Sequence, residues 1–373
     1  MGEGSMKAHG DGVVDRCNLP VLPHEMVAEI LLRLPVKSLL QFNPQFAIDH
    51  FRQLSSANNP LTSRLVYANK NYFDCRFGFL PLQPLFKNPS TTTPVVTFKM
   101  SNFIGSLDIL GSCNGLVYLH HLQSNCIYLW NPWTGFGSHW MRIEASSLSY
   151  FGFGYDHVHD KYKFVTVDTQ ALTLIYTFGS NSWNIGPNFP YPTVGLSGYI
   201  GKFLNGTGTL NWMAKVKEKN WVILSFDLAN ETFRQVSLPT LYGGGDNSCD
   251  PELQILRNCL CFSIDHRDII FDVWMMKDYG VWESWTLISR VNLWRHSNSY
   301  PLTPLFISEN DVLLLMLPDT RLALCKSDVD LFRFLSIDSS SDAHPFPISS
   351  SISQNLLART YFVHHDSLVV PPQ

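Results

Sequence analysis

The apolar positions of residues 22–42 follow a helical period. From Pro23 they recur three or four residues apart, and this first apolar face ends at Pro35, because proline cannot continue a helix. A second apolar face begins at Val36 and is interrupted by Asn43 and Pro44. Two short helices bury too little apolar surface to be stable alone, so we expect another surface to cover them.

Beyond residue 95 the apolar period changes to two, and short strands separated by polar turns continue to about residue 370. One unit recurs along this stretch, in which a polar turn and an apolar strand precede a second strand with a bulky anchor residue. The anchors are Trp130, Tyr176, Phe226, Trp274 and Leu324, separated by 46, 50, 48 and 50 residues. The polar turns fall near Asn114, Asp160, Asn205, Asn258 and Asn310, separated by 46, 45, 53 and 52 residues. Two independent markers therefore share one period.

A period near 50 residues with short strands is typical of the blades of a kelch-type β-propeller. Radial packing of such sheets into a closed ring also removes long exposed edges. Five units are visible, and a sixth can be assembled from residues 95–99 and 360–370, which would close the ring by pairing early and late strands. We predict a small all-α segment followed by an all-β, kelch-like β-propeller, with a twisted β-sandwich as the alternative.

These patterns divide the chain into four parts. Residues 1–19 are polar and Gly-rich and are predicted to be disordered, and residues 20–62 form the helical segment. Residues 63–94 are predicted to be a connecting segment before the β domain of residues 95–370.

The longest aliphatic run near the C-terminal end, Val312 to Leu317, is far shorter than the roughly 20 residues that cross a bilayer. With no apolar signal stretch at the start, we expect a cytoplasmic and/or nuclear protein.

Composition narrows the classes of partner. The chain has 27 basic and 31 acidic residues, for a net charge of -4. No overall positive field attracts nucleic-acid phosphates or an anionic membrane, so neither is an expected partner. Charged residues make up only 16% of the chain and aromatic residues 13%, which is typical of a well-packed β-rich domain.

Motifs for catalysis, metals and cofactors are missing from the sequence. The eight cysteines include no C-x-x-C pair and are expected to be reduced thiols that pack in the interior. The tightest histidine groups are His120 with His121, His157 with His159, and His364 with His365, and none has the spacing of a metal site. Asp227 and Glu231 fall in a hairpin turn, where such residues form turn hydrogen bonds. We predict a protein that is not an enzyme and has no cofactor.

Several motifs carry a family resemblance. The run LPHEMVAEILLRLPVKSLLQF resembles the start of the plant F-box. Downstream, GSCNGLVYL with LWNPWTG, FGFGYDHVHDKYKFV, ILSFDLANETF with SLP, and DVWMMKDYGVWESW resemble the plant F-box-associated domain, also described as F-box/kelch-repeat. Together these motifs cover most of residues 20–370, in the order expected of that family.

The resemblance implies a substrate-recognition subunit of a Skp/cullin/F-box ubiquitin ligase. Such a subunit binds a Skp-type adaptor, and through it a cullin, while its C-terminal domain holds the target protein and partner proteins perform the catalysis. The candidate adaptor-binding residues are Leu22, Pro23, Ile30, Leu31, Leu34, Pro35, Val36, Leu39 and Leu40. An unpartnered apolar helical pair fits this role, although packing against the chain's own β domain is the alternative.

The sequence departs from the family pattern after Phe42. In the family a further helix follows, whereas here Phe42 is followed at once by Asn43 and Pro44. At roughly 25 cal/mol per Å2, a few hundred Å2 of lost contact would cost several kcal/mol of adaptor binding. The alternative function is therefore a stand-alone interaction domain with weak or lost adaptor binding, which competes with full-length relatives.

The surface that binds the target is expected to be formed by loops on one rim of the propeller. The longest candidate loops are residues 186–198 and 237–251, and the second is rich in glycine. The sequence does not indicate which protein is the target.

Overall fold

The computed structural model describes residues 63–71, 74–87, 96–100, 107–121, 123–132, 134–143, 148–193, 199–217, 220–239, 250–266, 270–292, 302–317, 321–326, 329–335 and 361–365. The chain divides into two units, Met1–Pro44 and Gln45–Gln373, and all described residues belong to the second. The predicted disordered N-terminus and helical segment lie outside the described residues, so both remain predictions.

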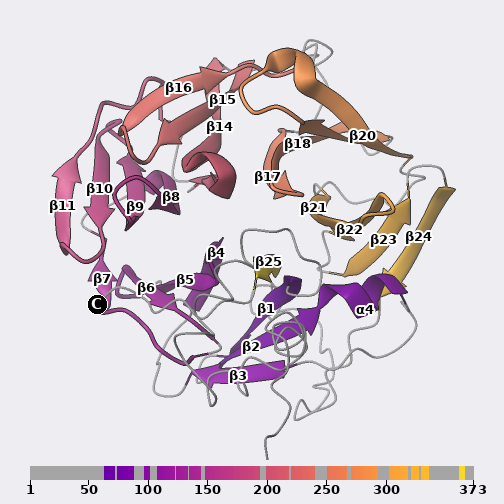
Figure 1. The fold of residues 1–373 in the computed structure, drawn as a ribbon, viewed down its shortest axis with the longest axis horizontal. Helices are drawn as coiled ribbons and strands as arrows, with labels where there is room; N and C mark the ends of the chain where they lie inside the picture. Colours follow the sequence, from indigo (N-terminus) through magenta and orange to yellow (C-terminus); the bar gives the residue numbers. More distant parts are fainter. Residues whose placement is uncertain are drawn as a thin grey trace, which may run out of the picture. The chain divides into compact units, whose positions relative to one another are not determined.

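The described residues form six β-sheets, which we call blades 1 to 6 and whose strands are given from the centre outward (Figure 1). Blade 1 contains β25 (Tyr361–His365), β1 (Ser63–Asn71), β2 (Asp74–Pro81) and β3 (Val96–Met100), with the helix α4 (Leu82–Lys87) after β2. Blade 2 contains β4 (Leu107–Cys113), β5 (Leu116–His121), β6 (Cys126–Trp130) and β7 (Met141–Arg142). Blade 3 contains β8 (Leu148–Asp156), β9 (Lys161–Asp168), β10 (Thr173–Thr177) and β11 (Ser182–Ile185), and β12 (Tyr199–Ile200) pairs in parallel with the inner edge of β8.

The remaining blades repeat the same antiparallel order. Blade 4 contains β13 (Lys202–Leu204), β14 (Thr209–Lys217), β15 (Asn220–Asp227) and β16 (Thr232–Val236), with the 3-10 turn η1 (Asn205–Thr207) after β13. Blade 5 contains β17 (Glu252–Leu256), β18 (Cys259–His266), β19 (Ile270–Met276) and β20 (Trp285–Asn292), with η2 (Trp282–Ser284) before β20. Blade 6 contains β21 (Thr303–Ile307), β22 (Val312–Met316), β23 (Leu322–Lys326) and β24 (Val329–Leu335).

The first strands of the six blades surround a common axis. Each contacts the first strand of the next blade, in the closed cycle β4, β8, β13, β17, β21, β25 and back to β4. Figure 1 shows the sheets arranged radially around this cycle. The β-propeller prediction is therefore confirmed, and the β-sandwich alternative is wrong.

Blade 1 closes the ring with strands from both ends of the β domain. β25 pairs antiparallel with β1, from Ser63 opposite His365 to Tyr67 opposite Tyr361. The sixth unit predicted from residues 95–99 and 360–370 is confirmed in part: β3 and β25 occupy those segments of one sheet, but they lie at its opposite edges, and β25 pairs with β1 rather than with β3. Residues 63–94, however, are more than the connecting segment that the sequence predicted, because they include β1, β2 and α4. Their strands lack the anchor and turn of the repeat, and their apolar residues pack against blade 2 on one side and blade 6 on the other.

Six apolar cores hold the ring together, each between two neighbouring blades. Between blades 3 and 4, for example, Tyr150 of β8 and Trp212 of β14 are both fully buried. Alternate residues of a single strand serve different cores: in β1, Leu65 packs toward blade 6 and Val66 toward blade 2. Burial of each large apolar side chain stabilises the folded state by roughly 1.5–3 kcal/mol relative to its exposure to water. Every blade therefore depends on both of its neighbours.

The repeat markers have fixed places in the blades. All five anchors lie on the third strand of blades 2 to 6, and all five polar turn residues lie between the first and second strands. Asn114, Asp160 and Asn258 have φ values of 48°, 55° and 55°, in the left-handed region that Asn and Asp tolerate best among residues with a side chain. The sequence period thus reflects a conformational requirement of the hairpin.

The propeller has two faces that differ in their connections. Because successive strands are antiparallel, turns between first and second strands and between third and fourth strands lie on one face, which we call the hairpin face. Turns between second and third strands, and the connections between blades, lie on the opposite loop face. α4 follows the third strand of blade 1 and so belongs to the hairpin face.

Removing β25 tests the closure of the ring. Truncation after Thr360 leaves β1 as an open edge and removes Val363 from the core beside blade 6. We expect the midpoint of thermal unfolding to fall by more than about 5 °C and the protein to self-associate. Truncation after Asp366, which retains β25, serves as the control. A monomer with an unchanged midpoint after the first truncation would contradict this account.

Candidate functional site

A pocket of about 560 Å3 opens at the centre of the hairpin face. Its walls come from α4, from the hairpins after β4, β13, β17 and β21, and from β25. Five of the six blades contribute, and blade 3 is absent from the walls. The volume lies within the usual range for ligand sites of proteins.

The pocket combines apolar walls with a set of side-chain amides. The apolar residues include Phe86, Phe203, Leu305, Phe306, Val312 and Val363. The amides include Asn114, Asn205, Asn258 and Asn310, which are four of the five recurrent turn residues identified in the sequence. In the sequence these asparagines are identified only as turn residues, because their convergence on one pocket depends on closure of the ring.

Several of these amides are available to a ligand. In the part of the chain that the structure describes, the side chains of Gln83, Asn258 and Asn310 make no hydrogen bond within the protein. The Oδ1 atom of Asn205 is buried and also has no partner there. A buried acceptor without a partner is costly, so a donor from a ligand would be stabilising.

The charges around the pocket balance. The guanidinium of Arg257 donates hydrogen bonds to the Ser308 carbonyl and, at 2.9 Å, to Asp311 Oδ1. Lys87 and Glu309 also line the pocket and have opposite charges. The Cys113 thiol lines the wall, and burial raises its pKa well above the usual value, so it remains protonated. The pocket therefore fits an uncharged ligand better than an ionic one.

Large apolar side chains are exposed on the same face. Among the six that the described residues contain, Phe136 is 59% exposed, Val158 74%, Val281 46% and Trp282 47%, and all four lie in hairpin-face turns. They lie in the turns of three blades, where a partner that covers this face would contact them.

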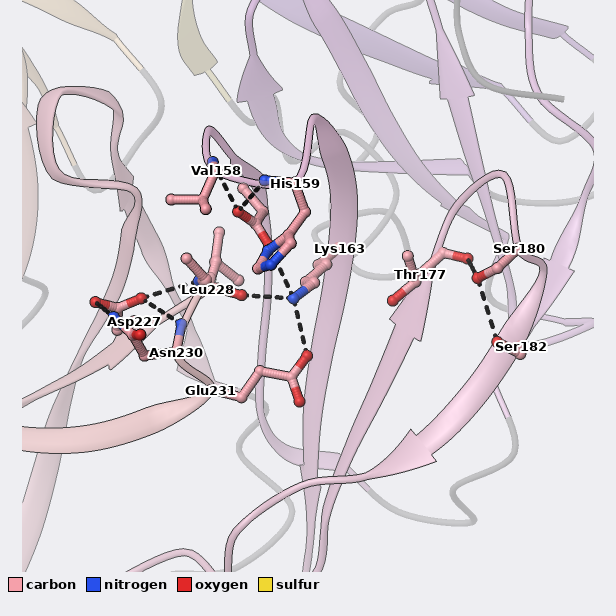
Figure 2. Close-up of polar contacts among 12 residues, drawn as sticks. Val158, His159, Lys163, Thr177, Ser180, Ser182, Asp227, Leu228, Asn230 and Glu231 are labelled. Carbon is pink, nitrogen blue, oxygen red and sulfur yellow. Dashed lines mark hydrogen bonds and ion pairs between the residues drawn. The ribbon is translucent and has the colours of Figure 1, made fainter.

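Ion pairs and hydrogen bonds fix the turns of blades 3 and 4 to each other, as Figure 2 shows. The buried Lys163 Nζ lies 3.0 Å from Asp156 Oδ2 of its own blade and 2.8 Å from Glu231 Oε1 of blade 4, and it donates to the Leu228 carbonyl at 2.6 Å. His159 Nδ1 contacts the same Asp156 oxygen at 2.8 Å. His157 Nε2 donates to the Asn205 carbonyl at 2.7 Å, which ties the blade 3 hairpin to the pocket wall.

The pKa values in this cluster reflect the pairing. Burial opposes the charge of Asp156, but hydrogen bonds from His159 and Lys163 outweigh it and lower the pKa of the carboxyl group. Burial likewise opposes the charge of Lys163, and its interactions with Glu231 and Asp156 raise the pKa of the ammonium group. Both groups are therefore charged at neutral pH, and neither has the poised pKa of a general acid or base.

A second polar cluster fixes blade 5 to blade 4. The Tyr279 hydroxyl, from the blade 5 turn, lies 2.8 Å from Asn211 Oδ1 and 2.7 Å from Ser225 Oγ. The guanidinium carbon of Arg234 lies 4.7 Å from the centroid of the Tyr279 ring. Together with the Arg257 contacts between blades 5 and 6, these bonds hold the hairpin-face turns in place.

The structure also locates residues that the sequence singled out. His120 pairs with Asn125 and His121 with Ser124, and the described residues contain no group of three or more side chains that could hold a metal ion. Asp227 accepts hydrogen bonds from the backbone of Ala229 and Asn230, as predicted for a turn. No helix in the described ranges is long and apolar enough to cross a membrane.

Other predicted site residues are not tested. The nine candidate adaptor-binding residues from Leu22 to Leu40 lie outside the described residues. Of the two long candidate loops, residues 194–198 and 240–249 are also outside them, and the described remainder belongs to the loop face. The hairpin-face pocket was not predicted from the sequence.

The family model that matches this chain agrees with the propeller architecture. The family model "F-box associated beta propeller domain" matches residues 90–354. An F-box/kelch-repeat protein of Arabidopsis thaliana is 28% identical over 369 residues, covering 91% of this chain and 94% of the relative. The F-box protein CPR1 of the same plant is 25% identical over 355 residues, covering 82% and 81%. Among solved structures, the nidogen/laminin complex includes a chain with a TM-score of 0.47 and 11% identity, covering 82% of this chain and 99% of that one.

The Lys163 cluster allows a direct stability test. Lys163→Met leaves the buried Asp156 carboxylate without its lysine partner, and we expect the free energy of unfolding to fall by about 3–5 kcal/mol in urea titrations. The double variant Asp156→Asn with Lys163→Met removes both charges and should recover much of that loss. The control is Lys161→Met, at an exposed lysine. Equal stability of Lys163→Met and Lys161→Met would show that the cluster does not link the blades.

Proposed function

The chain belongs to the family of F-box-associated β-propeller domains, and we propose that it is the substrate-recognition subunit of a Skp/cullin/F-box ubiquitin ligase. In this function the N-terminal apolar segment binds a Skp-type adaptor, and through it a cullin. The propeller holds a target protein for ubiquitylation. The partner proteins supply the catalysis, so this chain acts as a non-catalytic subunit of the complex, in the cytoplasm and/or the nucleus.

The F-box motif, joined to a propeller, supports the part of the proposal that concerns binding of the adaptor. The run from Leu22 to Phe42 has the wording of the start of a plant F-box, and the relatives are named F-box proteins. From the sequence, its leucines are expected to form an apolar stripe on two short helices, which is the type of surface that a groove in a partner covers. We assign the adaptor contacts to the nine residues given above from Leu22 to Leu40.

The hairpin face supports the part of the proposal that concerns binding of the target protein. It combines a central pocket with four exposed apolar side chains, and its turns are fixed by the Lys163, Tyr279 and Arg257 contacts. A surface that is held in one conformation loses little conformational entropy when it binds a partner. We therefore place the target protein on this face rather than on the loop face that the sequence analysis favoured.

The shortened F-box supports a second candidate function. Because Asn43 and Pro44 follow Phe42 directly, the adaptor surface lacks the contact area of a full F-box. A chain that binds targets without an adaptor would compete with full-length relatives and protect those targets from ubiquitylation.

Adaptor binding distinguishes the two candidates. We expect the full chain to co-purify with a Skp adaptor, and Leu31→Asp with Leu34→Asp to abolish the complex because charges replace the apolar contacts. Val158→Asp on the hairpin face is the matched control and should leave adaptor binding unchanged. If the unaltered chain forms no complex at micromolar concentration, the ligase proposal is wrong and the competitor function stands.

A further inference from the structure

We propose that the central pocket binds a short, extended and uncharged segment of the target polypeptide that carries one bulky apolar side chain. The inference rests on the proposed target-binding function and specifies the chemistry of the ligand. It is carried by the amides of the pocket, its apolar walls, its balanced charge and the exposed side chains around it.

The amides indicate a peptide backbone as ligand. Each carboxamide has one acceptor oxygen and an NH2 donor group, which complement the C=O and N–H of a peptide unit. The free side chains of Gln83, Asn258 and Asn310 and the unpaired Asn205 Oδ1 come from four different blades. An extended segment leaves its backbone groups available to them, whereas a helix satisfies its own.

The apolar wall provides a place for one anchor side chain. The rings of Phe86 in α4 and Phe306 in β21 lie with their centroids 5.5 Å apart, and Leu305 and Val363 line the same pocket. An aromatic or branched aliphatic side chain buried there gains roughly 1.5–3 kcal/mol relative to exposure. Such a buried anchor commonly dominates the energy of a protein interface.

The charge of the pocket wall determines which residues of the target segment can lie beside the anchor side chain. Arg257 forms an ion pair with Asp311, and the two other charged residues of the wall, Lys87 and Glu309, have opposite signs, so no net charge attracts an acidic or basic segment. An ionic side chain buried against the apolar wall would lose its hydration without an ion partner at that wall. The residues beside the anchor are therefore polar but uncharged.

The surroundings favour a protein over a small molecule. A small ligand that filled the pocket would leave Phe136, Val158, Val281 and Trp282 in water on the same face. A folded target with one segment in the pocket covers these side chains as well. The pocket then acts as the specific part of a larger interface.

A displayed library of random decapeptides tests the proposal. Peptides selected on the full chain should share one bulky apolar residue flanked by uncharged residues. In fluorescence titrations, Gln83→Trp, which fills the pocket from α4, should weaken their binding by roughly tenfold or more. Asn310→Trp fills the pocket from blade 6 and should have the same effect. Gln170→Trp, at an exposed position on the loop face, is the matched control and should bind like the unaltered chain.

Three results would overturn the proposal: no enriched peptide, selection of acidic or basic peptides, or equal binding to the pocket-filling variants and the unaltered chain. Unfolding midpoints of all three variants establish that they are folded. Co-purification of Gln83→Trp with the Skp adaptor separates this proposal from the ligase function, because a lost pocket leaves adaptor binding intact, whereas failure of the ligase function removes it from every variant.

Discussion

Face-to-face packing of neighbouring sheets is the interaction on which the whole structure depends. Each blade is apolar on both faces, so a single sheet left alone would expose the apolar residues of both faces to water. Only a closed cycle covers both faces of every blade. The pairing of β25 with β1 completes that cycle with strands almost 300 residues apart in sequence, and stability is therefore a property of the ring rather than of any blade.

The same closure creates the candidate site. The turn asparagines of four blades are far apart along the chain, and only the ring brings them to one pocket. Polar bonds between neighbouring turns then hold this face in one conformation, with Lys163 linking blades 3 and 4 and Arg257 linking blades 5 and 6. Apolar packing thus determines the architecture, and the polar clusters determine the positions of the side chains that a partner meets. The site has the features of a binding surface: amides, apolar walls and fixed turns.

Much of the fold could be predicted because its requirements are local and repeated. A bulky anchor on the third strand and an Asn or Asp in the first hairpin recur once in each of blades 2 to 6, so their period reports the architecture directly. β1 and β2 were missed because they lack both markers, and their burial depends on blades 2 and 6. The pocket was missed for a related reason. Locally, Asn258 and Asn310 are turn residues like those of the other hairpins, and they line one pocket only because the ring is closed. The family resemblance, in contrast, rested on contiguous motifs and is confirmed.

The central claim is that the hairpin face of the closed ring holds the target. Amide hydrogen exchange of the full chain, with and without a peptide selected from the library, tests it most directly. The account predicts slower exchange in α4 and in the hairpins at residues 112–115, 255–258 and 308–312, with no change in the loop-face turn at residues 169–172. Protection confined to the loop-face turns, with α4 and the pocket hairpins unchanged, would contradict it.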